Sequence, residues 1–351
     1  MHRLPECPAP NELREAFSAL DTLGYSATSR LPLFTARHWS PARERRAFQR
    51  FRAGECNIEE VAVPRWYWRR LSPSLHDLFR QLTLGHRRPG SPSPPALQAL
   101  WDGPLPRWRL LSRFGRYVLH SRPEIQDDSL VYFGDDTLFL MAGARRLLGF
   151  LQGPPLRVLD LCCGGGGVGL GLSVFPGELV GVDIHQPAIQ LAELAARAQG
   201  LTNYSYVCSE ATSVLDSRYD LIVGNPPTLS PELGGRSTLY ATGPASHFLE
   251  LLSRLVEALT PRGRALLTVF SRALGRGAQA EDPLRRDLAG LLNGRRSYRY
   301  SVRRQFPLEG GAWLRHVALE IFPHDDATGE SFESPADQGL QLPALTWRRG
   351  P

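Results

Sequence analysis

Residues 158–170 read VLDLCCGGGGVGL, and the fold can be predicted from this stretch. The apolar run at 156–161 passes directly into a turn that contains four consecutive glycines. A short apolar run bounded by turn residues is typical of a buried strand, and glycines allow a tight turn with close backbone approach. We therefore expect a strand, then a glycine-rich turn whose amide groups face a ligand, then a helix over 167–174.

The sequence after this turn alternates between short buried strands and helical segments. Strands are predicted at 156–161, 178–183, 204–208, 219–224 and 264–270, with helices at 167–174, 186–199 and 245–259 between them. Two extended runs, around 297–306 and 312–322, predict a closing hairpin at the sheet edge. Such alternation is typical of a doubly wound parallel sheet. The predicted fold class is therefore α/β, with a sheet of seven strands.

The N-terminal third has a different texture. Helical spacing is present at 11–24, and an Arg-rich helical stretch lies near 41–53. Short helices followed by a hairpin in residues 73–125 suggest a winged-helix-like unit, which can bind nucleic acid or serve as a docking module. The predicted divisions are a helical segment at 1–72, a winged-helix-like domain at 73–125, a catalytic domain at 126–323 and an irregular tail at 324–351.

Composition removes several classes of function. The chain has 351 residues and no lysine, so its Lys+Arg count of 41 is all arginine. Walker-type phosphate loops, pyridoxal phosphate enzymes, Schiff-base aldolases and protein kinases all need a lysine. The absence of lysine therefore argues against each of these classes.

Charge is unevenly distributed along the chain. Residues 1–122 hold 20 Arg against 10 Asp and Glu, a balance of +10, whereas residues 123–351 hold 21 against 25, a balance of −4. The basic third either faces an acidic partner such as nucleic acid or forms a solvated face. Within it, VPRWYWRRL at 63–71 offers rings for stacking on bases, although such side chains also close domain seams, which we favour.

The cysteines and the hydropathy pattern indicate in which cellular environment the protein works. The five cysteines form no C-x-x-C pair and no Cys/His cluster at zinc spacing, so we expect reduced thiols, no disulfide framework and no metal. No run of about 18 apolar residues is present, so a membrane span is not expected. The sequence therefore predicts a soluble, cytoplasmic protein.

Acidic residues lie at or just after the ends of three predicted strands. Asp160 lies at the end of the first strand, and Asp183 closes the second, 23 residues later. A carboxylate in that position binds both hydroxyls of a ribose. Glu210 follows the third strand, where it would face an adenine edge. The pattern favours a site for a nucleoside-containing cofactor.

The turn resembles the motif D-x-G-x-G-x-G of the class I S-adenosylmethionine-dependent methyltransferases. Asp160, Gly164 and Gly166 match it, while Cys162 replaces the first glycine, as in related nitrogen-methylating members with D-L-C-T-G-S-G-like turns. The resemblance implies a Rossmann-like sheet and S-adenosyl-L-methionine as cofactor, with S-adenosyl-L-homocysteine as product. The cofactor-binding residues that it implies are Phe133, Thr137, Asp160, Cys162, Gly164, Gly166, Asp183, Ile184, Glu210 and Asn225.

A second motif, YDLIVGNPP at 219–227, follows the fourth predicted strand. The two prolines fix the backbone so that the Asn225 side-chain oxygen and the Pro226 carbonyl both point into the site. Two such acceptors can hold the N–H groups of a planar amide or an exocyclic amine. Asn225, Pro226 and Pro227 are therefore the predicted catalytic residues.

The chain is similar over residues 130–322 to the N-P-P-Y branch of these methyltransferases, which includes release-factor glutamine methyltransferases and adenine or guanine amine methyltransferases. Thr228 stands where that branch has an aromatic residue. Tyr240, Phe139 or an N-terminal tryptophan is a possible substitute for the missing ring. The predicted substrate-binding residues are Thr228, Tyr240 and His247.

These features favour methylation of a nitrogen in a peptide, a protein or a specialised metabolite. The mildly acidic catalytic part lacks the basic surface expected around a phosphate backbone. Two alternatives stay open. One is an RNA or DNA amine methyltransferase that holds phosphates with its basic N-terminal region, and the other is a cofactor-binding interaction protein without catalysis.

Overall fold

The computed structural model describes residues 7–30, 69, 71–83, 95–102, 105–121, 131–151, 153, 156–172, 177–228, 245–275 and 280–324. The predicted helix at 41–53, the aromatic rings of the 63–71 stretch and the tail after residue 324 lie outside these ranges. The chain divides into two compact units, of which the first contains residues 1–145 and 162–210 and the second contains residues 146–161 and 211–351. None of the described helices is long and apolar enough to cross a membrane.

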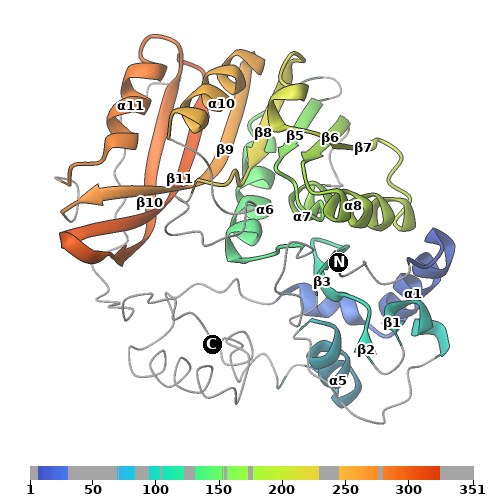
Figure 1. The fold of residues 1–351 in the computed structure, drawn as a ribbon. Helices are drawn as coiled ribbons and strands as arrows, with labels where there is room; N and C mark the ends of the chain where they lie inside the picture. The colour runs from blue at the N-terminus through green and yellow to red at the C-terminus, as the bar shows by residue number, and fades with distance from the viewer. Residues whose placement is uncertain are drawn as a thin grey trace. The chain divides into compact units, whose positions relative to one another are not determined.

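Seven strands form the central sheet (Figure 1). They are β5 (Leu156–Leu161), β6 (Gly177–Asp183), β7 (Tyr204–Cys208), β8 (Tyr219–Gly224), β9 (Leu259–Leu274), β10 (Ser297–Pro307) and β11 (Ala312–Phe322). Their order is β10-β11-β9-β8-β5-β6-β7. The pairs β5–β8, β8–β9 and β6–β7 are parallel, whereas β9–β11 and β11–β10 are antiparallel. The predicted α/β fold, with seven strands and a closing hairpin, is confirmed.

The first unit contains the N-terminal elements as well as β6 and β7. Its helices are α1 (Pro10–Thr22), η1 (Tyr25–Arg30), α5 (Pro73–Leu82), η3 (Pro95–Leu100), α7 (Gly167–Gly171) and α8 (Gln186–Ala198), and α6 (Asp135–Leu148) begins in it. Two short hairpins join β1 (Trp101–Asp102) to β2 (Leu105–Pro106) and β3 (Arg109–Arg113) to β4 (Arg116–His120). Helix α5 and the β3–β4 hairpin are present, but the winged-helix assignment stays a prediction.

Two polar clamps attach the N-terminal elements to helix α8. The Arg14 guanidinium donates to the carbonyls of Ala198 at 3.3 Å and Arg197 at 3.1 Å. Helix C-termini leave such carbonyls without intrahelical partners, so the arginine completes the end of α8. The Gln199 side chain also exchanges two hydrogen bonds with the Tyr117 backbone in β4, at 2.8 and 2.9 Å. These contacts make residues 1–145 and 162–210 one unit.

The second unit consists of β5, β8, β9, β10 and β11 with helices η4 (Ala211–Val214), α10 (Ala245–Ala258), α11 (Pro283–Leu292) and η5 (Glu309–Gly311). Strand β9 is longer than the predicted 264–270, because Leu259 already pairs with Tyr219 before the register shifts. Arg218 donates to the carbonyls of Glu257 and Leu259, and Arg296 to carbonyls at Leu259, Thr260, Pro261 and Gly263. The two arginines thereby fix the connection from α10 into β9.

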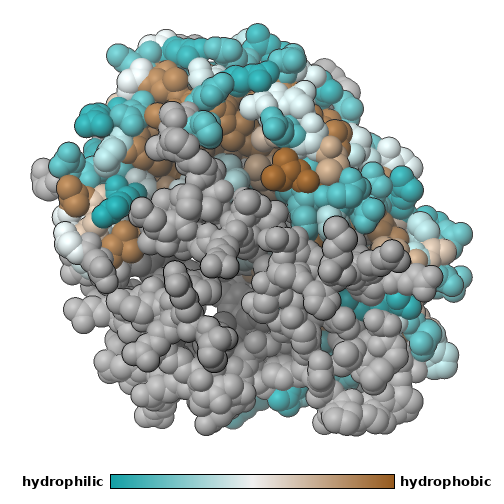
Figure 2. Space-filling view, in the orientation of Figure 1, coloured by the Kyte–Doolittle hydropathy of each residue, from teal (hydrophilic) through white to brown (hydrophobic). Residues whose placement is uncertain are grey.

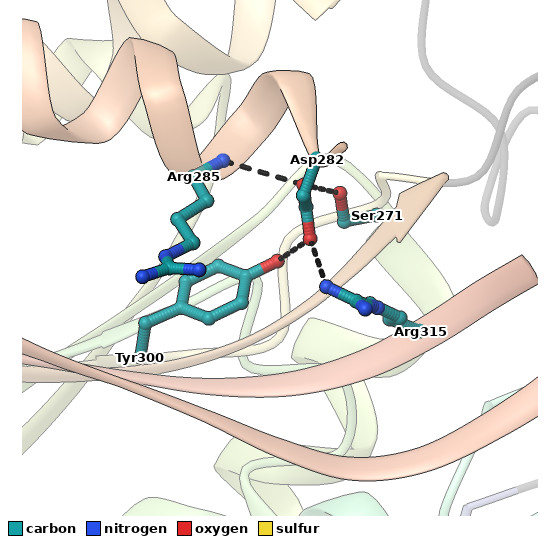
Figure 3. Close-up of polar contacts among 5 residues, drawn as sticks. All are labelled: Ser271, Asp282, Arg285, Tyr300 and Arg315. Atoms are coloured by element: carbon teal, nitrogen blue, oxygen red, sulfur yellow. Dashed lines mark hydrogen bonds and ion pairs between the residues drawn. The ribbon is translucent and has the colours of Figure 1, made fainter. Parts of the chain in front are cut away.

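A buried ionic cluster holds helix α11 to the sheet (Figure 3). Asp282 is the N-cap of α11, and both its side chain and that of Arg315 are fully buried, with 3.0 Å between Oδ2 and Nη1. Its carboxylate also accepts from the Ser271 hydroxyl at 2.6 Å and from the Tyr300 hydroxyl at 2.7 Å. Burial, and then Asp282, raise the pKa of Tyr300, so this phenol stays a donor. The cluster joins α11 to β9, β10 and β11.

Removing one member of this cluster should destabilise the protein strongly. Asp282→Asn leaves the Arg315 charge buried without its counter-ion, and we expect a loss of about 3–5 kcal/mol in the free energy of unfolding. The matched control is Asp287→Asn, since the ion pair of Asp287 with Arg286 is exposed and exposed pairs contribute about 0–1 kcal/mol. Urea unfolding measures both variants, and equal losses would contradict the interpretation.

Candidate methyl-transfer site

The glycine-rich turn of the first unit depends on left-handed backbone. Cys162 has φ +54°, Gly164 has +52° and Gly166 has +72°. The turn is closed by hydrogen bonds from the Cys163 amide to the Val182 carbonyl at 3.0 Å and from the Gly166 amide to the Cys163 carbonyl at 2.9 Å. Cys162 therefore occupies a backbone conformation that favours glycine.

The last three glycines of the turn, residues 165–167, leave no room for a side chain. A Cβ at Gly165 would lie 2.9 Å from the Leu119 carbonyl oxygen, one at Gly166 would lie 2.8 Å from the Tyr206 hydroxyl, and one at Gly167 would lie 2.9 Å from the Phe133 ring. The Thr137 methyl group is 3.2 Å from that last position. Phe133 and Thr137, both predicted cofactor residues, thus pack directly against the start of α7.

Asp183 connects the end of β6 to the turn. Its Oδ2 accepts from the Gly164 amide at 2.8 Å, and its Oδ1 accepts from the His185 amide at 2.9 Å. A carboxylate has about four lone-pair sites, so each oxygen keeps capacity for a further donor. The Ser209 amide donates to the Asp183 carbonyl at 3.0 Å, which brings the segment before Glu210 beside the end of β6. The sequence-predicted carboxylates of this unit therefore lie at one edge of its two strands.

Ile184 follows Asp183 and is 58% exposed. Apolar side chains also interrupt the hydrophilic surface elsewhere (Figure 2), so the exposure of Ile184 has meaning only together with the carboxylate beside it. A carboxylate with free acceptor capacity beside an exposed apolar side chain suits a ribose with an attached flat base. The residues present in this unit therefore fit the nucleoside part of S-adenosylmethionine.

His120, at the end of β4, is a neighbour of this region that the sequence did not reveal. Its ring stacks on Phe133, with 5.1 Å between ring centroids and an interplanar angle of 19°. Burial, and then the nearby Arg109 charge, hold the pKa of His120 well below its usual value, so the imidazole is neutral at physiological pH. The stack fixes the Phe133 ring against Gly167.

The second unit contains the other predicted residues. Asp160 is 1% exposed in β5, two positions before Cys162. Gly224 ends β8 so close to β5 that a Cβ would lie 2.7 Å from the Leu161 carbonyl oxygen. Asn225 follows immediately and is half-buried. Tight pairing of β5 with β8 thus sets where the N-P-P motif leaves the sheet.

Thr268 in β9 orients the Asn225 amide. The Thr268 hydroxyl donates to Asn225 Oδ1 with 2.7 Å between the oxygens, and Thr268 is fully buried. Because a hydroxyl donor fixes the oxygen end of the amide, the Asn225 side chain is held in one orientation. Sequence reasoning missed Thr268, since only the β8–β9 register shows that it lies next to Asn225.

Thr228 has a backbone-binding contact. Its hydroxyl oxygen accepts from the Phe270 amide at 2.7 Å, which ties the end of the N-P-P segment to β9. Pro226 is buried and Pro227 half-buried between these two anchors. The structure therefore brings together Asn225, Pro226, Pro227 and Thr228 as one fixed segment along β9.

The two remaining predicted substrate residues are not placed beside this segment. Tyr240 lies outside the described residues. His247 is exposed on α10, which packs with α11. Helix α11 is bonded through Asp282 to Ser271, whose side chain lies on the opposite face of β9 from Thr268. A contact of His247 with the acceptor stays a prediction.

Comparison with known proteins finds one family model and several curated relatives to which parts of the chain are similar. The sequence profile of the Methyltransferase small domain matches residues 139–276. A release factor glutamine methyltransferase of Fusobacterium nucleatum is 26% identical over 156 residues, 40% of this chain and 44% of that protein. An uncharacterised RNA methyltransferase of Geobacter sulfurreducens is 33% identical over 94 residues, 25% of this chain and 19% of that protein. The chain spans less than half the length of these curated relatives.

Among solved structures, the chain is similar to a SAM-dependent methyltransferase from Agrobacterium tumefaciens. It is 18% identical, has a TM-score of 0.46, and the alignment covers 61% of this chain and 69% of that chain.

Relief of the strain at residue 162 is measurable. In Cys162→Gly we expect the free energy of unfolding to rise by about 0.5–1 kcal/mol, because glycine adopts left-handed backbone without the Cβ penalty but loses more chain entropy. Gly164→Ala is the matched inverse, since its Cβ would have no neighbour closer than 3.7 Å, and it should lose about 1 kcal/mol. Urea unfolding measures both variants. A loss of stability in Cys162→Gly together with a gain in Gly164→Ala would disprove strain at this turn.

Proposed function

We propose that the protein transfers the methyl group of S-adenosylmethionine to a planar nitrogen. The premise is that residues 139–276, which match the Methyltransferase small domain, form a class I S-adenosylmethionine-dependent methyltransferase domain. The observation that carries this proposal is the Asn225 amide, held by the Thr268 hydroxyl at 2.7 Å directly after β8. An amide oriented in this way directly after a parallel strand is placed as a site that positions a flat acceptor requires.

The first unit would hold the cofactor. Asp183 would accept the ribose hydroxyls with the lone pairs that Gly164 and His185 leave available, and Ile184 would cover the adenine face. Glu210 would face the adenine edge, and Phe133 and Thr137 would lie near the methionine end. When bound, the cofactor supplies an electrophilic methyl group on a sulfonium, so catalysis needs no metal and no covalent intermediate.

The second unit would hold the acceptor nitrogen. Asn225 Oδ1 and the Pro226 carbonyl would each accept an N–H of the acceptor, which polarises the nitrogen and turns its lone pair toward the methyl group. A delocalised nitrogen is a poor nucleophile, so placement of this kind is the main contribution that the protein makes. The nitrogen loses one proton after transfer, and water can take it.

A side-chain amide of a peptide or protein is the acceptor that we favour. The match to a release factor glutamine methyltransferase extends over 156 residues, longer than the 94 residues matched in the RNA methyltransferase. Residues 123–351 carry a balance of −4, which is unfavourable for holding a phosphate backbone. The two observations together favour a peptide over RNA.

An RNA base amine is the second candidate. The name of the Geobacter sulfurreducens relative and the +10 balance of residues 1–122 favour it. RNA binding that involves several phosphate contacts weakens steeply as the salt concentration rises. A salt titration of short RNA binding therefore separates this candidate from the amide acceptor, whose binding would change little.

Two substitutions should separate cofactor binding from transfer. Asn225→Ala is expected to abolish methyl transfer to a glutamine-bearing peptide while calorimetric binding of S-adenosylmethionine is retained, because it removes the acceptor contact and the partner of the Thr268 hydroxyl but leaves the Asp183 contacts in place. Asp183→Ala is expected to weaken cofactor binding, because it removes the ribose acceptor.

Thr268→Val is a milder change at the same site as Asn225→Ala. It keeps the Asn225 amide and removes only the hydroxyl that orients it, so kcat should fall by about tenfold with cofactor affinity unchanged. Small and equal effects of Asn225→Ala and Asp183→Ala on binding and on transfer would contradict the assignment.

A further inference from the structure

Residue 228 is a threonine where the resemblance leads us to expect an aromatic residue, and it is bonded to strand β9. Thr268 and Phe270 are two residues apart in β9, so their side chains lie on the same face of the sheet, about 7 Å apart along the strand. Thr268 donates to the Asn225 amide, and the Phe270 amide donates to the Thr228 hydroxyl. The Phe270 side chain is therefore the next one along the face of β9 that carries the Thr268 hydroxyl, which binds the Asn225 amide.

A histidine supports this ring from the neighbouring strand. Phe270 pairs with His316 of β11 in the antiparallel register, and their rings stack with 5.0 Å between centroids and an interplanar angle of 27°. His316 is 8% exposed, whereas Phe270 is only half-buried. The imidazole thus forms the covered side of the pair and the phenyl ring forms the accessible side. Such a backed ring is held in one plane, which is what a stacking surface needs.

We propose that Phe270, backed by His316, is the surface on which the flat amide of the acceptor lies, and that it replaces the aromatic residue absent at position 228. The proposal rests on the proposed function and deepens it by naming a specificity residue. An amide whose nitrogen is held by Asn225 Oδ1 would lie beside β9 near Thr268, and the Phe270 ring is the next side chain on that face of the strand. Thr228 has a different task, which is to fix the segment to the Phe270 amide.

Binding to the intact protein saturated with S-adenosylhomocysteine tests this surface. The probe is a glutamine-bearing peptide, measured by calorimetry with wild type, Phe270→Leu and Phe270→Tyr. Loss of the flat ring in Phe270→Leu should weaken peptide binding by about tenfold, whereas Phe270→Tyr should bind as wild type does. The control is Phe150→Leu, since Phe150 is a 59% exposed phenylalanine of the same unit outside the proposed machinery.

Cofactor titration of each variant keeps the outcomes distinct. If Phe270→Leu binds S-adenosylhomocysteine and folds as wild type does but also binds the peptide equally well, the stacking surface is disproved. Absence of peptide binding to the cofactor-saturated wild type overturns the stacking surface as well. In this experiment the proposed function is contradicted by a different result, the absence of cofactor binding. Adenosine binding that depends on Phe270, with no peptide binding, would overturn the amide as the acceptor.

Discussion

Parallel strand pairing is the constraint on which the rest of the structure depends. Pairing of β5 with β8 and of β8 with β9 brings three carboxyl ends to one edge of the second unit, and pairing of β6 with β7 does the same in the first unit. Peptide backbone at such an edge is free to turn toward a ligand. Asp183, Glu210 and Asn225 stand at or just after these ends. Gly224 shows how close the pairing is, because no Cβ would fit between β8 and β5 there.

The local motifs could be read from the sequence because their chemistry is contiguous. The glycine-rich turn, the carboxylate that closes β6 and the N-P-P segment after β8 each need only neighbouring residues. Cys162 is instructive, since a non-glycine residue in this turn was visible as a departure and the structure gives it left-handed backbone. The helix α11 also had a signal that was not used, namely an Asp-Pro pair at its N-cap and first position.

The long-range contacts could not be predicted, for a physical reason. Thr268 and Phe270 acquire their meaning only from the register of β9 against β8 and β11, and a shift of one residue would send both side chains to the other face. The same holds for His120, which reaches Phe133 through the β3–β4 hairpin. The buried cluster of Asp282 and Arg315 joins residues 33 positions apart and left no trace in the pattern of apolar residues.

The central claim is that this chain binds S-adenosylmethionine through its glycine-rich turn, and calorimetric titration of the wild-type protein tests it most directly. The account predicts saturable binding with about one site per chain and a dissociation constant in the micromolar range, for both S-adenosylmethionine and S-adenosylhomocysteine. Absence of binding heat with both compounds, confirmed by an unchanged thermal unfolding midpoint at saturating concentration, would contradict the account.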